Sequence, residues 1–265
     1  MTDDWRPNWL TRIFAALAAS MSALPLAASA NADPPAYAAF FDRVFEPGFR
    51  AKISDESIDK SGPFEIAFNI ITPAPLRISS GAIVACDPLV EIERKAFTQA
   101  VPNGAHRVRL AFADARDRGK RLAFARVDFS QMPVVTWKMA LVPGQNIKSL
   151  KKGEVFGYPV DAGTGSFLDP AVGQFLSRER IAQQDKDTAS DSVSEAWITD
   201  GETEGKKSGV SFLLNVETGQ GNAVMFTSGW GDGFYTSWFG YDAEGRPAAL
   251  VTDFNLEEWD KAKAQ

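Results

Sequence analysis

The sequence predicts a mainly β protein with a few helices (α+β), arranged as an antiparallel sandwich or barrel-like sheet that ends in a three-stranded meander. Short apolar runs separated by clusters of Pro, Gly, Asn and Asp recur from residue 64 to residue 160, at the spacing expected of antiparallel strands. Residues 222–254 then contain three further apolar runs divided by two glycine-containing turns. A few other stretches have the periodicity or the start signals of a helix. Together these observations favour one β-rich domain.

The expected strands follow directly from the apolar runs. They occupy residues 64–71, 76–78, 81–86, 107–113, 121–129, 134–141, 155–160 and 209–216. In the final stretch we expect three sequential antiparallel strands within residues 223–254, with reversals at 229–233 and 242–245. The middle strand of this meander has large apolar side chains on both faces, which indicates that both faces are buried or that one of them faces a pocket.

Three helices are expected before residue 182. Apolar residues at i, i+3, i+4, i+7 and i+8 run through residues 37–45, and this stripe predicts a helix that packs on the core or, alternatively, binds a partner. Asp87-Pro88 and Asp169-Pro170 each place a capping residue before a proline at the first helical position. Each pair therefore predicts the start of a helix.

The polar residues 183–207 interrupt the apolar pattern, since Ser, Thr, Asp and Glu dominate them. We expect a long surface excursion inside the domain, with Trp197 docking its middle onto the protein. Near the C-terminus, Asn255 and Glu258 are spaced as in a capping box. This spacing predicts a short C-terminal helix.

Residues 1–32 have the features of a secretory signal. Two arginines precede an uncharged run of apolar and small residues at 13–26, and the small residues around Ala30 form the pattern that a signal peptidase needs. The run is shorter than the roughly 20 apolar residues that cross a bilayer, and no second long apolar segment follows. We therefore expect an exported protein, periplasmic or extracellular, with residues 33–265 forming a single globular domain.

Composition excludes several classes of function. The chain has 28 Lys and Arg against 34 Asp and Glu, a net charge of −6, which disfavours nucleic-acid binding. Cys86 is the only cysteine, so no intramolecular disulfide is possible, and its apolar neighbours predict a buried thiol. His106 is the only histidine, which removes multi-histidine metal sites and leaves one base for a catalytic triad with Ser166 or Ser228. We expect His106 to be a surface residue.

Three segments carry a resemblance to a known family. Residues 76–89 read LRISSGAIVACDPL, residues 157–169 read GYPVDAGTGSFLD, and residues 228–233 read SGWGDG, followed by Tyr235 and by the Gly-Tyr-Asp of residues 240–242. In this order they resemble the family of domains of unknown function numbered 4241, and together they span most of the chain after the signal. The resemblance implies no particular reaction.

The placement of three aspartates suggests a site. Asp87 ends an expected strand, Asp161 precedes a Gly-Thr-Gly turn, and Asp232 lies between two glycines at a turn. Capping explains Asp87, and turn formation is the alternative explanation for Asp161 and Asp232. Because glycine turns on adjacent strands often line one cleft, we expect Asp161 and Asp232 at neighbouring turns with Asp87 close by.

Two functions remain open from the sequence. The first is a binding module that contacts an unknown protein or small-molecule ligand through the glycine-rich turns. Its contact residues would be drawn from Asp87, Thr164, Trp230, Tyr235 and Trp238. The second is a hydrolase for a sugar or cell-wall substrate, with Asp161 and Asp232 as catalytic carboxylates or as ligands of a cation. The sequence leaves the identity of any cofactor open, including a cation.

Overall fold

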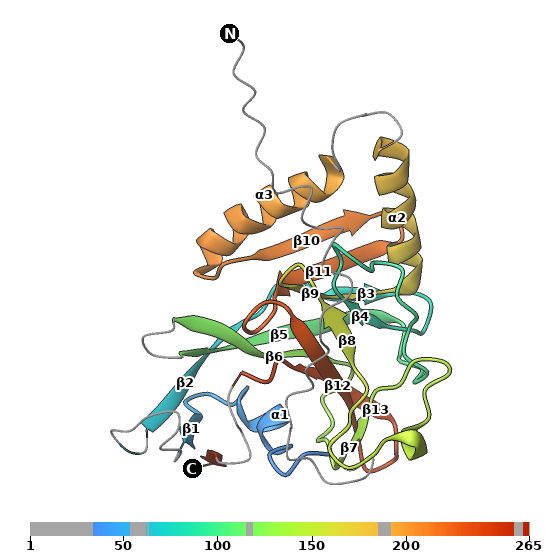
Figure 1. Cartoon of the computed structure of the whole chain (residues 1–265). Helices are drawn as coiled ribbons and strands as arrows, with labels where there is room; N and C mark the ends of the chain where they lie inside the picture. Colours follow the sequence, from blue (N-terminus) through green and yellow to red (C-terminus); the bar gives the residue numbers. More distant parts are fainter. Residues whose placement is uncertain are drawn as a thin grey trace.

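The computed structural model describes residues 34–53, 62, 64–114, 119–184, 192–256 and 262–264 of the chain. The strands form two antiparallel sheets, and helices cover their outer sides (Figure 1). The structure confirms the predicted mainly β class with a few helices. The described strands pack as a sandwich and do not close into a barrel.

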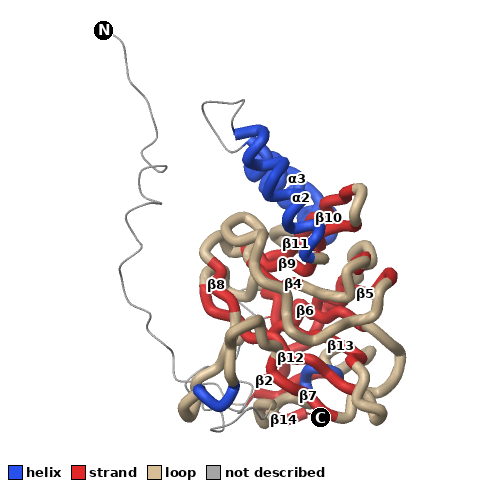
Figure 2. Tube along the Cα trace, turned by 90° about the vertical axis from the view of Figure 1, so that its right-hand side faces the viewer, coloured by secondary structure: helices blue, strands red, loops and turns tan. Residues whose placement is uncertain are grey.

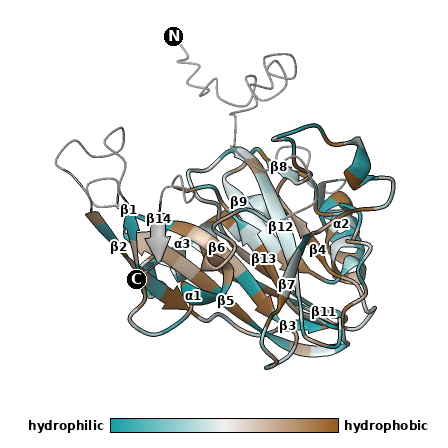
Figure 3. Cartoon of the chain, turned by 90° about the horizontal axis from the view of Figure 1, so that it is seen from below, coloured by the Kyte–Doolittle hydropathy of each residue, from teal (hydrophilic) through white to brown (hydrophobic). Residues whose placement is uncertain are grey.

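The larger sheet has the order β14-β1-β2-β5-β6-β13-β12-β7, with β3 paired to β5 and β8 paired to β12. Its strands are Arg50–Ile53 (β1), Phe64–Ile71 (β2), Leu76–Ile78 (β3), Gly104–Asp114 (β5), Lys120–Asp128 (β6), Thr136–Met139 (β7), Tyr158–Val160 (β8), Gly233–Tyr241 (β12), Pro247–Asp253 (β13) and Ala262–Ala264 (β14). The apolar runs predicted most of these positions, but they predicted neither β1 nor β14. Hydrophilic and hydrophobic segments alternate along strands such as β5 (Figure 3).

The smaller sheet has the order β10-β11-β9-β4. Its strands are Leu213–Thr218 (β10), Gly221–Thr227 (β11), Thr164–Leu168 (β9) and Val84–Cys86 (β4). All five residues of β9 are buried because the larger sheet covers one face and helices cover the other. The edge strand β10 is only partly buried.

The helices lie on the outer faces of this sandwich. They are α1 (Phe40–Arg43), α2 (Pro170–Gln184) and α3 (Ser192–Ser208), with a short 3₁₀ turn, η2, at Ile147–Ser149. Figures 1 and 2 show α2 and α3 together above the smaller sheet, and α1 at the opposite end of the molecule. None of the described helices is both long enough and apolar enough to span a membrane.

The core consists of three apolar clusters. One fills the space between the two sheets and includes Val108, Phe167 and Phe226. A second lies between the larger sheet and the α1 region, and a third lies between the smaller sheet and helices α2 and α3. Each sheet is therefore covered on both faces over most of its width.

The predicted three-stranded meander is wrong in one respect. Strands β11, β12 and β13 lie where expected, and β12 pairs with β13 in an antiparallel hairpin. Strand β11, however, pairs with β10 and β9 in the smaller sheet. The turn at 229–233 therefore passes from one sheet to the other. The alternation of apolar residues marks a strand but does not say which partner it pairs with.

The helix predictions had mixed outcomes. The stripe at 37–45 is buried as expected, but only α1 within it is a regular helix. Asp169-Pro170 begins α2, whereas the residues after Asp87 form turns instead of the predicted helix. Within the polar stretch 183–207, the described residues from Ser192 onward form helix α3, which the sequence did not predict, and Trp197 is buried as expected. The signal at 1–32 and the C-terminal helix predicted after Asn255 lie outside the described residues.

Candidate functional site

The site predicted from the sequence is organised around Asp87, which directly follows β4. Its Oδ2 atom accepts hydrogen bonds from the backbone N–H groups of Asp161 at 3.0 Å and Ala162 at 2.7 Å. Its Oδ1 atom accepts a third hydrogen bond from the N–H group of Leu89 at 3.0 Å. Burial raises the pKa of the Asp87 carboxyl above its ordinary value, although these hydrogen bonds oppose the shift. Asp87 is thus a buried support for the turn that contains Asp161.

Gly163 joins that turn to the loop after β11. Its carbonyl accepts a hydrogen bond from the N–H group of Ser228 at 3.0 Å, and its own N–H donates to Oδ1 of Asp232 at 3.1 Å. A φ of +63° places Gly163 in the left-handed region, and a Cβ there would lie 3.7 Å from the Cα of Gly231. The two glycine-rich turns therefore lie against each other, as the sequence predicted.

Asp161 and Asp232, the proposed catalytic pair, are both exposed on these adjoining turns. The expected arrangement, with the two turns as neighbours and Asp87 close by, is confirmed. The catalytic role of the pair stays a prediction. Across the described residues, no group of three or more His, Cys, Asp or Glu side chains is arranged to hold a metal ion.

Two aromatic side chains are exposed on the loop after β11 and on the start of β12. Trp230 is 43% exposed and Phe234 is 46% exposed. The indole N–H of Trp230 donates to the carbonyl of Leu256 at 3.1 Å, and the guanidinium of Arg121 lies 5.4 Å from the centroid of its ring. These contacts fix the orientation of the indole and leave part of its ring accessible. The sequence pattern does not single out Phe234, because alternation alone cannot show which face of β12 is open at its start.

Tyr235 lies beneath this surface and supports it. The side chain is buried, and its hydroxyl donates to the carbonyl of Gly231 at 2.8 Å. Burial, with a contribution from the nearby charge of Asp232, raises the pKa of Tyr235 to about 12. A Cβ at Gly233 would lie 2.9 Å from the Tyr235 ring, so this glycine makes room for the tyrosine. Tyr235 therefore acts on the turn from inside the protein.

The structure buries two other residues that the sequence suggested as binding residues. Thr164 is 4% exposed, and its hydroxyl donates to the carbonyl of Ala162 at 3.1 Å. Trp238 is 4% exposed and packs against Phe41 in the core. Both residues hold the fold together and do not reach the surface formed by the two turns.

Structural contacts also involve the histidine and the two serines considered for a catalytic triad, as well as Cys86. His106 is buried, with Nε2 2.7 Å from the carbonyl oxygen of Pro102, so the prediction of a surface histidine is wrong. Cys86 is buried as predicted, and burial raises the pKa of its thiol to about 12. The hydroxyl of Ser166 donates to the carbonyl of Cys86 at 3.0 Å, and the hydroxyl of Ser228 donates to a carbonyl within its own turn.

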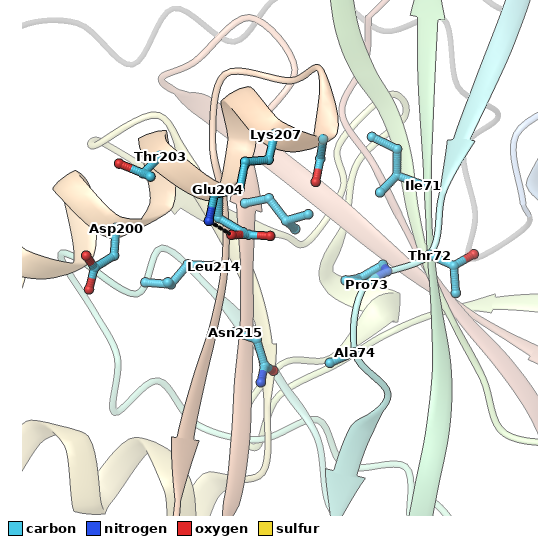
Figure 4. A pocket seen from close by; sticks show the side chains of 12 residues that line it. Ile71, Thr72, Pro73, Ala74, Asp200, Thr203, Glu204, Lys207, Leu214 and Asn215 are labelled. Atoms are coloured by element: carbon cyan, nitrogen blue, oxygen red, sulfur yellow. Dashed lines mark hydrogen bonds and ion pairs between the residues drawn. The ribbon is translucent and has the colours of Figure 1, made fainter.

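A cleft lies elsewhere, along the outer edge of β10, and the sequence did not predict it. Its volume is about 540 Å³. One wall is the side of α3 that presents Asp200, Thr203, Glu204, Lys207 and Ser208, the other wall is residues 71–74, and between them lie Leu213, Leu214 and Asn215 (Figure 4). Residues 71–74 are distant in sequence from α3 and β10, so no local motif marks the cleft.

Comparison with known proteins gives one match. A family model described as "Protein of unknown function (DUF4241)" matches residues 76–252. The match includes strands β3 to β13 and helices α2 and α3, and therefore every residue of the site predicted from the sequence. Neither the curated proteins nor the solved structures include a match to this chain.

Proposed function

This chain belongs to the family described as "Protein of unknown function (DUF4241)", and we propose that it is an exported binding module. Its contact surface is the pair of joined turns at 161–163 and 228–234, which we call the double-turn surface. The observation that carries the proposal is that two buried or turn carboxylates hold the backbone of this surface in place. Asp87 and Asp232 accept backbone N–H groups of the 161–163 turn and thereby hold the surface rigid.

A rigid pair of turns favours binding for a physical reason. Ordering a loop or a side chain on association costs free energy, and a surface that is already ordered avoids that cost. Trp230 and Phe234 supply exposed aromatic area on this support, and aromatic residues contribute strongly to binding when a ligand covers them. A sugar ring or an apolar protein side chain could lie against them.

The second candidate function is a hydrolase, and one observation favours it. Asp161 and Asp232 are both exposed on adjoining turns, beside exposed aromatic rings that could hold a sugar. Against it, Asp232 already accepts a hydrogen bond from Gly163, and Asp87 is enclosed by three backbone donors. The binding module therefore accounts for more of the contacts.

One experiment separates the two functions. Purified protein is applied to an array of oligosaccharides and peptidoglycan fragments, and any ligand is then followed by titration calorimetry and chromatography. The binding module predicts a complex without shortened products, weakened about tenfold or more in Trp230→Ala and Phe234→Ala. Thr164→Ser changes a buried residue that does not reach the surface, and this control variant should bind normally. Shortened products that disappear in Asp161→Asn or Asp232→Asn would favour the hydrolase.

Export is part of the proposal and has its own test. The uncharged run at 13–26 and the small residues around Ala30 support removal of a signal segment. Intact-mass analysis of protein from the native host should give a chain that begins near Asn31 or Asp33. Recovery of the full-length chain from the membrane fraction would contradict export.

A further inference from the structure

Strand β10 is the outermost strand of the smaller sheet and has one unpaired edge. Among the described strands it pairs with β11 alone. The N–H group of Thr227 donates to the carbonyl of Phe212, which identifies residues 212 and 227 as a hydrogen-bonded pair. Because hydrogen-bonding groups alternate along an antiparallel pair, the backbone groups of Leu213, Asn215 and Glu217 point away from β11. These three residues form what we call the open edge.

The cleft of about 540 Å³ lies directly along this open edge. Leu213 and Asn215 are among its lining residues, between the wall formed by α3 and the wall formed by residues 71–74 (Figure 4). Helix α3 packs tightly on Phe212, the residue before β10, since a Cβ at Gly201 or Gly205 would overlap it, and this contact fixes the position of α3 beside the edge. The walls therefore keep a slot open beside an unpaired strand.

Proteins usually protect such an edge, because unpaired N–H and C=O groups attract another strand. Proline, a β-bulge or a covering loop would provide that protection, and β10, with the sequence LLNVET and a regular register to β11, has no proline and no bulge. We propose that the cleft binds an extended peptide segment of a partner protein, which adds to β10 as a fifth strand of the smaller sheet. This site is separate from the double-turn surface and does not depend on the function proposed for it.

The walls of the cleft specify the side chains of that peptide. Residues of a strand point alternately to its two faces. On one face, Ile71 and Leu213 belong to the apolar cluster between the sheets, so they favour apolar side chains in the partner. On the other face, the ammonium group of Lys207 pairs with Glu204 at 2.9 Å and leaves the carboxylate of Asp200 as a net negative charge. The expected ligand therefore alternates basic and apolar residues.

The first test uses a fluorescent heptapeptide of alternating lysine and valine with blocked ends, and follows its anisotropy as wild-type protein is added. Two derivatives carry N-methyl groups either on every valine or on every lysine. In a strand that pairs with β10, only one of these sets faces the open edge, so one derivative should bind and the other should lose about tenfold or more in affinity. Equal binding of the two derivatives, or no binding of the parent peptide up to about 1 mM, would overturn the proposal.

A pair of variants tests the same contact from the side of the protein. Asn215→Pro removes the N–H group that residue 215 presents to the cleft, whereas Asn215→Ala removes only the side-chain hydrogen bonds to Asn222 and Glu217. Binding of the heptapeptide should be lost in Asn215→Pro and retained in Asn215→Ala. If Asn215→Pro does not fold, the two methylated derivatives still decide the question on wild-type protein. A homodimer in light scattering that the heptapeptide does not dissociate would assign the edge to a second copy and overturn the proposal.

Discussion

Asp87 and Asp169 occupy equivalent places at the two ends of one strand pair, and comparing them shows what a local signal does and does not determine. Strands β4 and β9 are antiparallel neighbours, and each is followed directly by an Asp-Pro pair. Oδ2 of Asp87 accepts two N–H groups of the turn before β9. Oδ2 of Asp169 accepts the N–H groups of Ser79 and Ser80, at 2.8 Å each, in the turn before β4. Each aspartate therefore accepts hydrogen bonds from the turn that leads into the partner strand, and we call this arrangement a clasp.

The similarity extends to the glycines in the clasped turns. Gly81 comes directly after Ser79 and Ser80, and Gly163 comes directly after the two residues that Asp87 holds. Gly81 has a φ of +72° and Gly163 a φ of +63°, so both take the left-handed conformation. The two ends of the strand pair are built in the same way up to this point.

The two ends differ in the segment on the C-terminal side of each aspartate. Both aspartates cap the residues that follow them, since Oδ1 of Asp87 accepts the N–H group of Leu89 and Oδ1 of Asp169 accepts that of Ala171. After Asp169, helix α2 continues to Gln184. After Asp87, one helical hydrogen bond forms from Glu91 to Asp87, but no helix continues. The reason is tertiary, because the guanidinium of Arg180 on α2 donates to the carbonyls of Pro88 and Leu89.

Helix α2 also occupies the space beside that segment. A Cβ at Gly173 would lie 2.5 Å from the carbonyl oxygen of Ile92, so the two backbones are in direct contact. A helix starting at Asp87 would have to displace α2 from the smaller sheet. The same start signal thus yields a helix at one end and a set of turns at the other.

The largest expected effect comes from removing the two clasps. Asp169→Ala leaves the N–H groups of Ser79, Ser80 and Ala171 without their acceptor and removes the cap of α2. We expect a loss of about 2–4 kcal/mol in the free energy of unfolding, measured by urea denaturation. Asp87→Ala should cost less, about 1–2 kcal/mol, because it also relieves a buried charge.

A matched control for this comparison is Asp200→Ala, which changes an exposed aspartate on α3 and should alter stability by less than about 0.5 kcal/mol. Equal losses in Asp87→Ala and Asp169→Ala would contradict the distinction drawn between the two ends.

The pH dependence should also distinguish the two aspartates. Burial raises the pKa of Asp169, but hydrogen bonds from Ser79, Ala171 and Ser80 outweigh it and lower the pKa below the ordinary value. Its stabilising contribution is therefore present above the pKa of the unfolded chain and is lost as the pH falls through the lowered pKa. For Asp87 the pKa is raised, so its carboxyl binds a proton more readily in the folded protein and favours folding as the pH falls.

The measurement uses Asp169→Asn and Asp87→Asn in urea denaturation between about pH 3 and pH 6. The stability advantage of wild type over Asp169→Asn should grow as the pH rises. The advantage over Asp87→Asn should shrink over the same interval. If the stability difference from wild type changes with pH in the same way for both variants, the pKa values of the two carboxyls are not shifted in opposite directions.

A smaller effect is expected from the clasped glycines. Alanine at either position must adopt a positive φ, which costs about 1 kcal/mol. The nearest atoms to a new Cβ are 3.6 Å away at Gly81 and 3.7 Å away at Gly163, so neither variant adds a clash. Gly81→Ala and Gly163→Ala should therefore match Gly245→Ala, a control with a φ of +76° and open space around it, in thermal unfolding. A much larger fall in the unfolding temperature for Gly163→Ala would show that the substitution strains the contact of this residue with the 228–232 turn.

The smallest effect is expected at Tyr158, which lies on β8 just before the turn clasped by Asp87. Among the described residues its hydroxyl is the one buried side-chain nitrogen or oxygen atom that no hydrogen bond of good geometry reaches, and Thr252 interacts with it only weakly. Removing an unsatisfied buried hydroxyl costs no hydrogen bond, so Tyr158→Phe should be neutral or slightly stabilising in urea denaturation. A loss above about 1 kcal/mol would reveal a partner for the hydroxyl and a tighter link between β8 and the Asp87 clasp.

The sequence by itself determined most of the strands, because each of these is a short apolar run bounded by turn residues, and this pattern is local. It did not predict β1 and β14, which are short and contain charged residues. It also predicted that the glycine turns carrying Asp161 and Asp232 are neighbours, and the hydrogen bond from Gly163 to Asp232 confirms this. Only the tertiary structure decided which strands pair, since β11 could bury its apolar faces as well in the smaller sheet as in a meander with β12. It alone stopped a helix after Asp87, where α2 takes the space. It alone created the cleft beside β10, where residues 71–74 meet the distant segment that forms α3 and β10. Local patterns fix which residues are to be buried, whereas the partner that buries them is settled by packing across the whole chain.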